Sequence, residues 1–164
     1  MPHRLFVLNG PNLNLLGRRE PAVYGRDTLA DLEQRCRAVA DELDFDLFFA
    51  QTNHEGQLID WVHLAFEEQA AVVINPAGFT TRSVALYDAL RMLHAPVVEV
   101  HLTNIFGREA IYQQSLTAAA AWGFIAGLGP SGYELAIRAL AHRLADADAA
   151  DADAADADAD ADRA

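Results

Sequence analysis

Short apolar segments alternate with segments of helical periodicity along the first 145 residues of the chain. The apolar segments are rich in β-branched and aromatic residues and predict five strands, at residues 4–9, 46–51, 71–75, 97–102 and 123–127. Amphipathic helices are predicted at residues 28–43, 56–69, 83–93, 109–119 and 132–144. Because strands that are apolar throughout need cover on both faces, the alternation predicts a parallel sheet between two layers of helices.

The order of these elements suits an α/β fold of the flavodoxin-like, doubly wound type, with a five-stranded parallel sheet in three layers. Ligands bind such sheets beyond the carboxyl ends of the strands, where the strand order reverses. A polar loop at residues 9–24 follows the first strand, and Asn75 ends the third. Glu99 and His101 belong to the fourth. These groups should meet at one edge of the sheet, which favours an active site over unrelated surface loops.

Glu99 and His101 are two residues apart in the fourth predicted strand, so their side chains should lie on the same face. Each needs a polar partner inside an otherwise apolar strand. A carboxylate at this spacing would orient the imidazole and favour its protonated form. A structural role for His101 stays open, but we favour a general acid at His101 that Glu99 supports.

Tyr24 follows Arg18 and Arg19 in the polar loop, a grouping in which positive charge could make a phenol basic. A phenol titrates near pH 10, so basicity near neutrality requires its pKa to fall by about 2–3, which corresponds to about 3–4 kcal/mol. A cation about 4 Å away contributes about 4 kcal/mol at an effective dielectric constant of about 20. One arginine would suffice, and Arg19 and Arg108 are the candidates. The alternative is a surface loop whose charged side chains lie in water.

The net charge of −12 is concentrated at the end of the chain, where residues 146–164 contain eight aspartates and Arg163. This segment has no large apolar side chain, so we expect a disordered acidic tail after a catalytic domain at residues 1–145. An acidic chain is repelled by phosphate backbones, which argues against a nucleic-acid partner. No apolar run reaches the roughly 18 residues of a membrane span, so we expect no membrane partner and a cytoplasmic protein.

Missing residue types exclude several mechanisms. All twelve Lys and Arg residues are arginines, so there is no lysine for a Schiff base, for pyridoxal phosphate or for a Walker-type phosphate site. The six histidines lack the spacing of metal ligands, and we expect neither a metal nor an organic cofactor. The single cysteine, Cys36, lies in an apolar helical stripe and is expected to be a buried structural thiol.

Six segments occur along the chain in the order and spacing of a known family. They are NGPNLNLLGRREPAVYG, QTNHEGQLIDW, NPAGFT, SVAL, VVEVHLTNI and GLGPSGY. Together they cover about residues 4–144 and resemble the type II 3-dehydroquinate dehydratases. The resemblance implies loss of water from 3-dehydroquinate to give 3-dehydroshikimate, by anti elimination through an enolate and without a cofactor. It also implies flavodoxin-like subunits assembled as a dodecamer of trimers.

The resemblance also implies roles for six catalytic positions, which are Asn12, Arg19, Tyr24, Glu99, His101 and Arg108. Tyr24 would take the proton beside the ketone, with Arg19 next to it on a mobile lid and Arg108 as a further cation. Asn12 would hold the water that stabilises the enolate. His101 would protonate the departing hydroxyl group, and Glu99 would support it.

Six further positions match the family's substrate-binding residues or replace them. Asn75 and the backbone of Leu102 and Thr103 match positions that bind substrate, and Asp88 matches an acid donated by a neighbouring subunit. The chain departs at Thr81, where the family usually has histidine, and at Tyr112, where it has arginine. Tyr87 also replaces a usual arginine.

The departures leave three functions open. The family's residues at positions 81 and 112 hold substrate hydroxyls, so their loss weakens recognition of the substrate more than proton transfer. The leading hypothesis is 3-dehydroquinate dehydratase. A second is the same chemistry on another cyclic or polyhydroxy carbonyl acid, and a third is a non-catalytic binding protein on this scaffold.

Overall fold

A computed structural model describes residues 2–18 and 20–161 of the chain. Its five strands form one parallel sheet in the order β2-β1-β3-β4-β5. The strands are β1 (His3–Asn9), β2 (Phe45–Gln51), β3 (Ala71–Asn75), β4 (Val97–His101) and β5 (Gly123–Ala126). This confirms the predicted doubly wound α/β fold. The strand order reverses between β1 and β3, so the predicted ligand position lies beyond their carboxyl ends.

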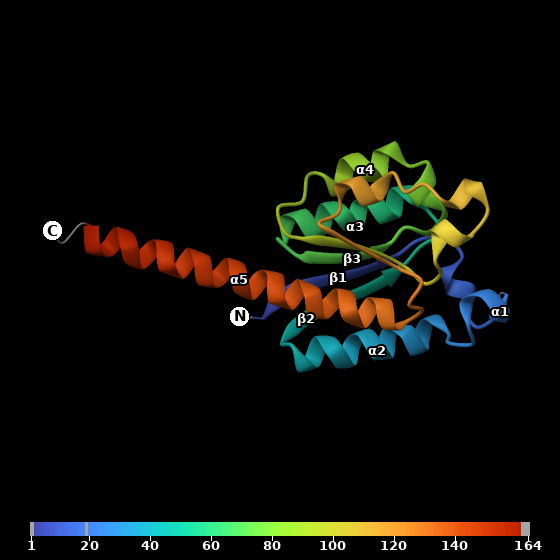
Figure 1. Cartoon of the computed structure of the whole chain (residues 1–164), viewed down its shortest axis with the longest axis horizontal. Coiled ribbons are helices and arrows are strands. Elements are labelled where there is room, and N and C mark those ends of the chain that lie inside the picture. The colour runs from blue at the N-terminus through green and yellow to red at the C-terminus, as the bar shows by residue number, and fades with distance from the viewer. Residues whose placement is uncertain (1, 19, 162–164) are drawn as a thin grey trace.

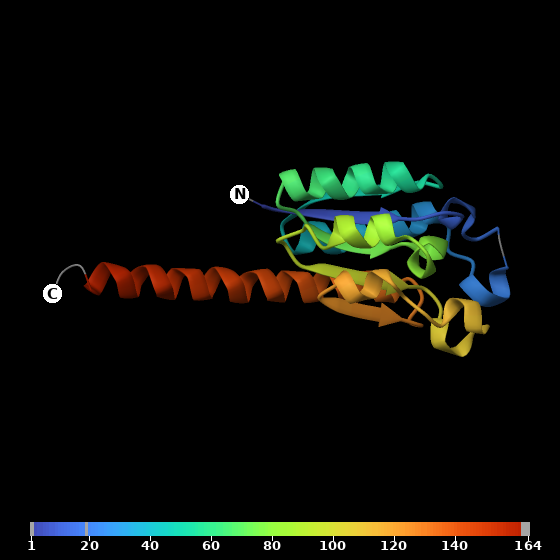
Figure 2. The ribbon, with the colours of Figure 1, turned by 90° about the horizontal axis from the view of Figure 1, so that it is seen from above.

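Two helices cover each face of the sheet (Figures 1 and 2). On one face lie α2 (Leu29–Glu42) and α5 (Ser131–Ala161), and on the other lie α3 (Glu55–Glu67) and α4 (Val84–Leu90). The side chains of each strand enter two buried cores in alternation, because successive side chains point to opposite faces of the sheet. In β1, Leu5 and Val7 pack toward α2 and α5, whereas Phe6 and Leu8 pack toward α3 and α4.

The polar side chains near the strand ends follow the same alternation. Asn9 and Asn75 are register partners at the ends of β1 and β3, and by alternation they face the α2 and α5 layer. Val97 packs in the core on the side of α3 and α4. Glu99 and His101 lie two and four residues after it, so they face the same side. Both pairs are buried, and both lie close to the same edge of the sheet.

The start of α2 and the position of Cys36 agree with the sequence. Thr28 caps the helix by accepting a hydrogen bond from the Asp31 backbone, and the Asp31 carboxylate accepts one from the Thr28 backbone in return. Cys36 lies on the buried stripe of α2 with no exposed surface. The expected burial of this thiol is confirmed.

The helix predicted at residues 109–119 is wrong. The segment contains two short 3-10 turns instead, η4 (Ala110–Tyr112) and η5 (Thr117–Ala120), and a third, η3 (Ile105–Gly107), precedes them. Ser115 breaks the helical pattern because its hydroxyl accepts a hydrogen bond from the Ala118 backbone and starts a new turn. The Leu116 backbone N–H donates to the carbonyl of Thr80 in another loop. Tertiary contacts therefore replace the helical hydrogen bonds that the apolar pattern suggested.

The disordered tail expected after residue 145 also differs from the structure. α5 continues through Ala161, past the amino ends of the strands (Figures 1 and 2). The physical reason lies in the alternating composition, because alanine has the highest helix propensity and offsets the repulsion between aspartates. Within the described ranges, no helix is both long and apolar enough to cross a bilayer.

Candidate active site

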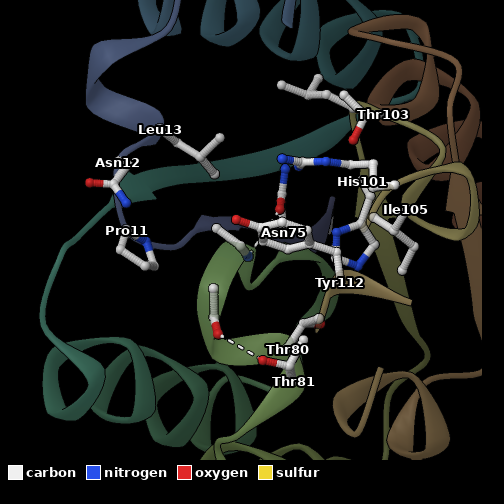
Figure 3. Close-up of a pocket in the computed structure, with 14 residues that line it drawn as sticks. Pro11, Asn12, Leu13, Asn75, Thr80, Thr81, His101, Thr103, Ile105 and Tyr112 are labelled. Carbon is white, nitrogen blue, oxygen red and sulfur yellow. Dashed lines mark hydrogen bonds between the residues drawn. The ribbon is translucent and has the colours of Figure 1, made fainter. Parts of the chain in front are cut away.

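A cavity of about 190 Å³ opens at the carboxyl ends of β1, β3 and β4 (Figure 3). Its walls come from the loops that follow these three strands. The lining residues are Pro11, Asn12, Leu13, Asn75, Ala77, Gly78, Thr80, Thr81, His101, Leu102, Thr103, Ile105, Arg108 and Tyr112. The cavity therefore lies at the position that the reversal of strand order predicts for a ligand.

A close approach between two loops holds the β1 side of the cavity. The Gly10 backbone N–H donates to the Asn75 carbonyl at 2.8 Å, and a Cβ at position 10 would lie 2.3 Å from the Pro76 carbonyl oxygen. Only glycine fits this contact. Asn12 then turns with a φ of 68°, and its backbone N–H donates to the Asn53 side chain at 2.9 Å. Asparagine tolerates this left-handed conformation better than most residues, which places it at the rim.

Glu99 and His101 form a buried pair behind the cavity wall. Glu99 Oε1 lies 2.7 Å from His101 Nε2, and only His101 lines the cavity. The His101 ring also packs against Phe124, with ring centroids 5.4 Å apart. With Nε2 engaged by the carboxylate, Nδ1 is the ring nitrogen left for proton exchange with a ligand. The predicted contact between these two side chains is confirmed.

Three hydroxyl groups surround the same carboxylate. Thr80 and Ser115 each donate to Glu99 Oε1 at 2.7 Å, and Thr117 lies 2.8 Å from the Thr80 hydroxyl. Glu99 Oε2 is buried without a hydrogen-bond partner among the described residues. Burial raises the pKa of Glu99, but hydrogen bonds from His101, Thr117 and Ser115 outweigh it and hold the pKa below its usual value. Glu99 is therefore a carboxylate at neutral pH.

Asn75 holds the centre of the cavity (Figure 3). Its Nδ2 group donates to the hydroxyl of Tyr133 at 2.8 Å, and its Oδ1 atom accepts from the Ala77 backbone at 3.1 Å. Tyr133 in turn donates to Asn9 at 2.8 Å. The orientation of the Asn75 amide is therefore fixed from both ends.

Arg108 and Tyr112 form the far wall together. The Arg108 guanidinium carbon lies 4.1 Å from the centroid of the Tyr112 ring, a cation–π contact. Thr81 sits opposite on η2 (Ala77–Thr81), where its hydroxyl lies 3.5 Å from the Gly78 carbonyl. Arg82 is exposed and is not among the lining residues. These side chains give one cation, one aliphatic hydroxyl and one phenol ring for ligand recognition.

Comparison with known proteins identifies the family. A family model described as dehydroquinase class II matches residues 3–141. The chain belongs to the class II dehydroquinase family.

Curated and solved members of this family match the chain over most of its length. A relative from Chelativorans sp. (strain BNC1), named 3-dehydroquinate dehydratase, is 52% identical over 145 residues, which cover 88% of this chain and 100% of the relative. 3-Dehydroquinate dehydratase 2 of Agrobacterium fabrum is 54% identical over 134 residues, which cover 82% and 91%. The crystal structure of type II dehydroquinase from Propionibacterium acnes matches with a TM-score of 0.84 and 45% identity, over 87% of this chain and 98% of that one.

Most of the family positions predicted from the sequence come together at the cavity. It is lined by Asn12, Asn75, Thr81, His101, Leu102, Thr103, Arg108 and Tyr112, and Glu99 lies directly behind His101. Asp88 is exposed on α4 and is not among the residues that line the cavity of its own chain. Arg19 lies outside the described residues, and the description of Tyr24 is limited to the backbone of α1 (Pro21–Tyr24).

The residues that hold Glu99 and Asn75 in place, behind the cavity wall, were not identified from the sequence pattern. Thr80, Ser115 and Thr117 converge on Glu99 through long-range contacts that the predicted helix at residues 109–119 concealed. Tyr133 was recoverable, because it shares the apolar spacing of Ala136, Ile137 and Leu140 on α5, and a buried phenol needs a partner. No group of three or more His, Cys, Asp or Glu side chains within the described residues could hold a metal ion.

Proposed function

We propose that this chain is a hydro-lyase that removes water from 3-dehydroquinate to give 3-dehydroshikimate. The observation that carries the proposal is the buried contact between Glu99 and His101 at a cavity of suitable polarity. The names of the curated relatives, which are about half identical to this chain over most of its length, support the same substrate. Loss of water through an enolate needs a base, a general acid and groups that stabilise negative charge on oxygen.

The first step removes the proton beside the ketone. Tyr24, as a phenolate, takes this proton, and the electron pair moves into the carbonyl group to form an enolate. Arg19 or Arg108 favours the phenolate by its positive charge. Asn12 holds the water molecule that donates a hydrogen bond to the enolate oxygen. The position of Asn12 at the cavity rim supports this role.

The second step breaks the bond to the departing hydroxyl group. The enolate returns its electron pair to form the carbon–carbon double bond as the carbon–oxygen bond breaks. His101 donates a proton to the hydroxyl, which leaves as water, and Glu99 stabilises the imidazolium before this transfer. Tyr24 then returns its proton through solvent, and His101 is protonated again. The product is a conjugated enone.

Substrate recognition falls to groups that surround the reacting carbons. The Asn75 amide and the backbone at Leu102 and Thr103 bind polar groups of the substrate, a role that their place in the cavity supports. Arg108 attracts the substrate carboxylate and contributes to the positive potential near the enolate.

Ultraviolet absorbance of the conjugated product tests this function. We expect the purified protein to form an enone from 3-dehydroquinate, and we expect Tyr24→Phe to bind the substrate without forming product. If the original protein forms the enone, and Tyr24→Phe binds 3-dehydroquinate but forms none, the protein is an enzyme. Absence of product from both proteins, in a well-folded oligomer that still binds 3-dehydroquinate, would indicate a binding protein instead.

The stacked pair of Arg108 and Tyr112 favours a second candidate function. An aromatic ring at this wall offers a single hydroxyl in place of a guanidinium fork, so it suits a substrate with fewer hydroxyl groups at that end. The reaction would then be the same elimination on another cyclic carbonyl acid. A screen of such acids by product absorbance distinguishes the two, because one substrate should show the highest kcat/KM.

We also propose that the protein works as a homo-oligomer, a dodecamer of trimers in which twelve subunits are grouped as trimers. The support is the exposed position of Asp88, which is not part of the cavity of its own chain, together with exposed large apolar side chains such as Phe106 and Ile111. Light scattering should give twelve times the subunit mass of 17.9 kDa. A monomer with full activity would contradict this proposal.

A further inference from the structure

Tyr133 is a fully buried phenol that no step of the proposed reaction uses. It lies at the start of α5, where its side chain reaches the carboxyl ends of β1 and β3. There it contacts Asn9 and Asn75, which are register partners on the two central strands. One side chain from a helix therefore joins the two strand ends between which the strand order reverses.

The four hydrogen bonds around Tyr133 all run in one direction. Asn9 Nδ2 donates to the Ala50 carbonyl at 3.1 Å, which leaves Asn9 Oδ1 as the acceptor for Tyr133. Tyr133 has one hydroxyl hydrogen and gives it to Asn9, so toward Asn75 it can only accept. Asn75 Oδ1 accepts from the Ala77 backbone, which agrees with its Nδ2 facing Tyr133. Reversing the Asn75 amide would break two of these bonds at once.

This directional chain leaves Asn75 with one free N–H and one free lone pair. Asn75 lines the cavity, so these are the groups that it can offer to a ligand. Since an asparagine amide that can flip presents donor and acceptor interchangeably, a fixed amide binds a given polar group more tightly. Burial raises the pKa of Tyr133 far above its usual range, so the hydroxyl stays protonated and the direction does not change with pH.

We propose that Tyr133 is a positioning residue that orients the Asn75 amide for substrate binding, and that Asn9 sets the direction of the Tyr133 hydroxyl. The proposal rests on the function proposed above, because Asn75 matters only where it binds substrate. Tyr133 does not touch the substrate, and its effect passes through Asn75. A purely structural role would alter stability or the folded fraction without changing the KM of the folded molecules.

The test is Tyr133→Phe, which removes only the hydroxyl group. We expect the KM for 3-dehydroquinate to rise about tenfold while kcat stays within about threefold, since the lost interaction is equal in ground state and transition state. Cys36→Ala is the control for a change in the same core, because Cys36 is buried in the cluster that contains Tyr133, does not line the cavity and should keep the KM of the original protein. An unchanged KM in a folded Tyr133→Phe would overturn the proposal.

A double-mutant cycle separates an action through Asn75 from a general effect. We expect Asn75→Ala to raise KM by itself, and Tyr133→Phe to add nothing further in that background. Independent, additive effects of the two substitutions would overturn the proposal. If Tyr133→Phe does not fold, Asn9→Leu carries the same test, because it removes the acceptor that orders the hydroxyl.

Crystal structures of the original protein and of Tyr133→Phe keep the inference testable without turnover. We expect the Asn75 side chain to rotate or to become disordered in the variant, and an Asn75 amide held in place would overturn the proposal. Absence of turnover by the original protein would refute the proposed function alone. Turnover with an unchanged KM in Tyr133→Phe would refute this inference alone.

Discussion

The Oε1 atom of Glu99 lies within hydrogen-bond distance, 2.7 Å, of the Nε2 atom of His101, and both side chains are buried. A buried carboxylate is costly unless hydrogen bonds compensate for the lost water. Here the compensation is concentrated on one oxygen, Oε1, which Thr80, Ser115 and His101 all approach. The ionised Glu99 therefore holds Ser115, and with it the loop between η4 and η5, against the sheet.

Stability in acid should depend on Glu99. Its pKa is lowered in the folded protein, so it contributes stability above its unfolded pKa near 4.5, and this contribution is lost as the pH falls through the lower folded value. We expect the denaturation midpoint of the original protein to fall more steeply below pH 5 than that of Glu99→Gln. Urea denaturation at several pH values measures this difference.

Glu42→Gln is the matched control for the acid experiment. The pKa of Glu42 is also lowered, through its hydrogen bond to Arg138, but that pair lies in solvent on the surface. Exposed ion pairs contribute little to stability, so this variant should keep the acid dependence of the original protein. Parallel curves for Glu99→Gln and the original protein would contradict the account of Glu99.

Activity on 3-dehydroquinate should respond to the two departures from the family pattern. If Thr81 and Tyr112 change the substrate, Thr81→His combined with Tyr112→Arg should raise kcat/KM for 3-dehydroquinate at least about tenfold, which corresponds to about 1.4 kcal/mol. The physical reason is that each new side chain would pair with a substrate hydroxyl. No gain in a folded double variant would refute the changed-substrate hypothesis.

Cys36 should be inert in the native protein. Burial raises the pKa of its thiol to about 12, and the side chain has no exposed surface. We expect no reaction with a disulfide reagent at pH 8 in the native state and complete reaction in denaturant. Rapid reaction of the native protein would show that α2 opens locally, contrary to its packing against the sheet.

The fold could be predicted from the sequence because its elements are locally consistent. Most positions of the five strands are apolar, and Thr28 is a typical N-cap residue directly before the apolar stripe of α2. The segment after β4 could not be predicted, since its Leu116 backbone pairs with Thr80 rather than within a helix. Likewise, the acidic segment at residues 146–161 is helical because alanine propensity acts without an apolar stripe.

The candidate site was predictable in part for the same reason. Polar residues at the ends of apolar strands, such as Asn75 and His101, reveal themselves by their place in the pattern. The hydroxyl groups behind these residues could not be predicted. A serine such as Ser115 fits many loops, and its role follows only from its tertiary contact with Glu99. Tyr133 reads as one more core residue until Asn9 and Asn75 are seen beside it.

Removal of the chain after Ala145 should leave activity within about twofold, because no cavity residue lies beyond that point. Residues 146–154 are exposed, and the ion pair of Asp148 with His3 lies in solvent. Steady-state kinetics and a thermal melt of the shortened protein measure the effect. Loss of activity at an unchanged melting temperature would show that the acidic segment takes part in function.

Enone formation from 3-dehydroquinate, followed in parallel for the original protein and His101→Ala, tests the proposed elimination and the role of its general acid together. We expect product from the original protein and a kcat at least about a hundredfold lower for His101→Ala, because the general acid is gone. We also expect both proteins to melt cooperatively and to bind 3-dehydroquinate. No product from the folded original protein, or an undiminished rate in His101→Ala, would contradict the proposed mechanism.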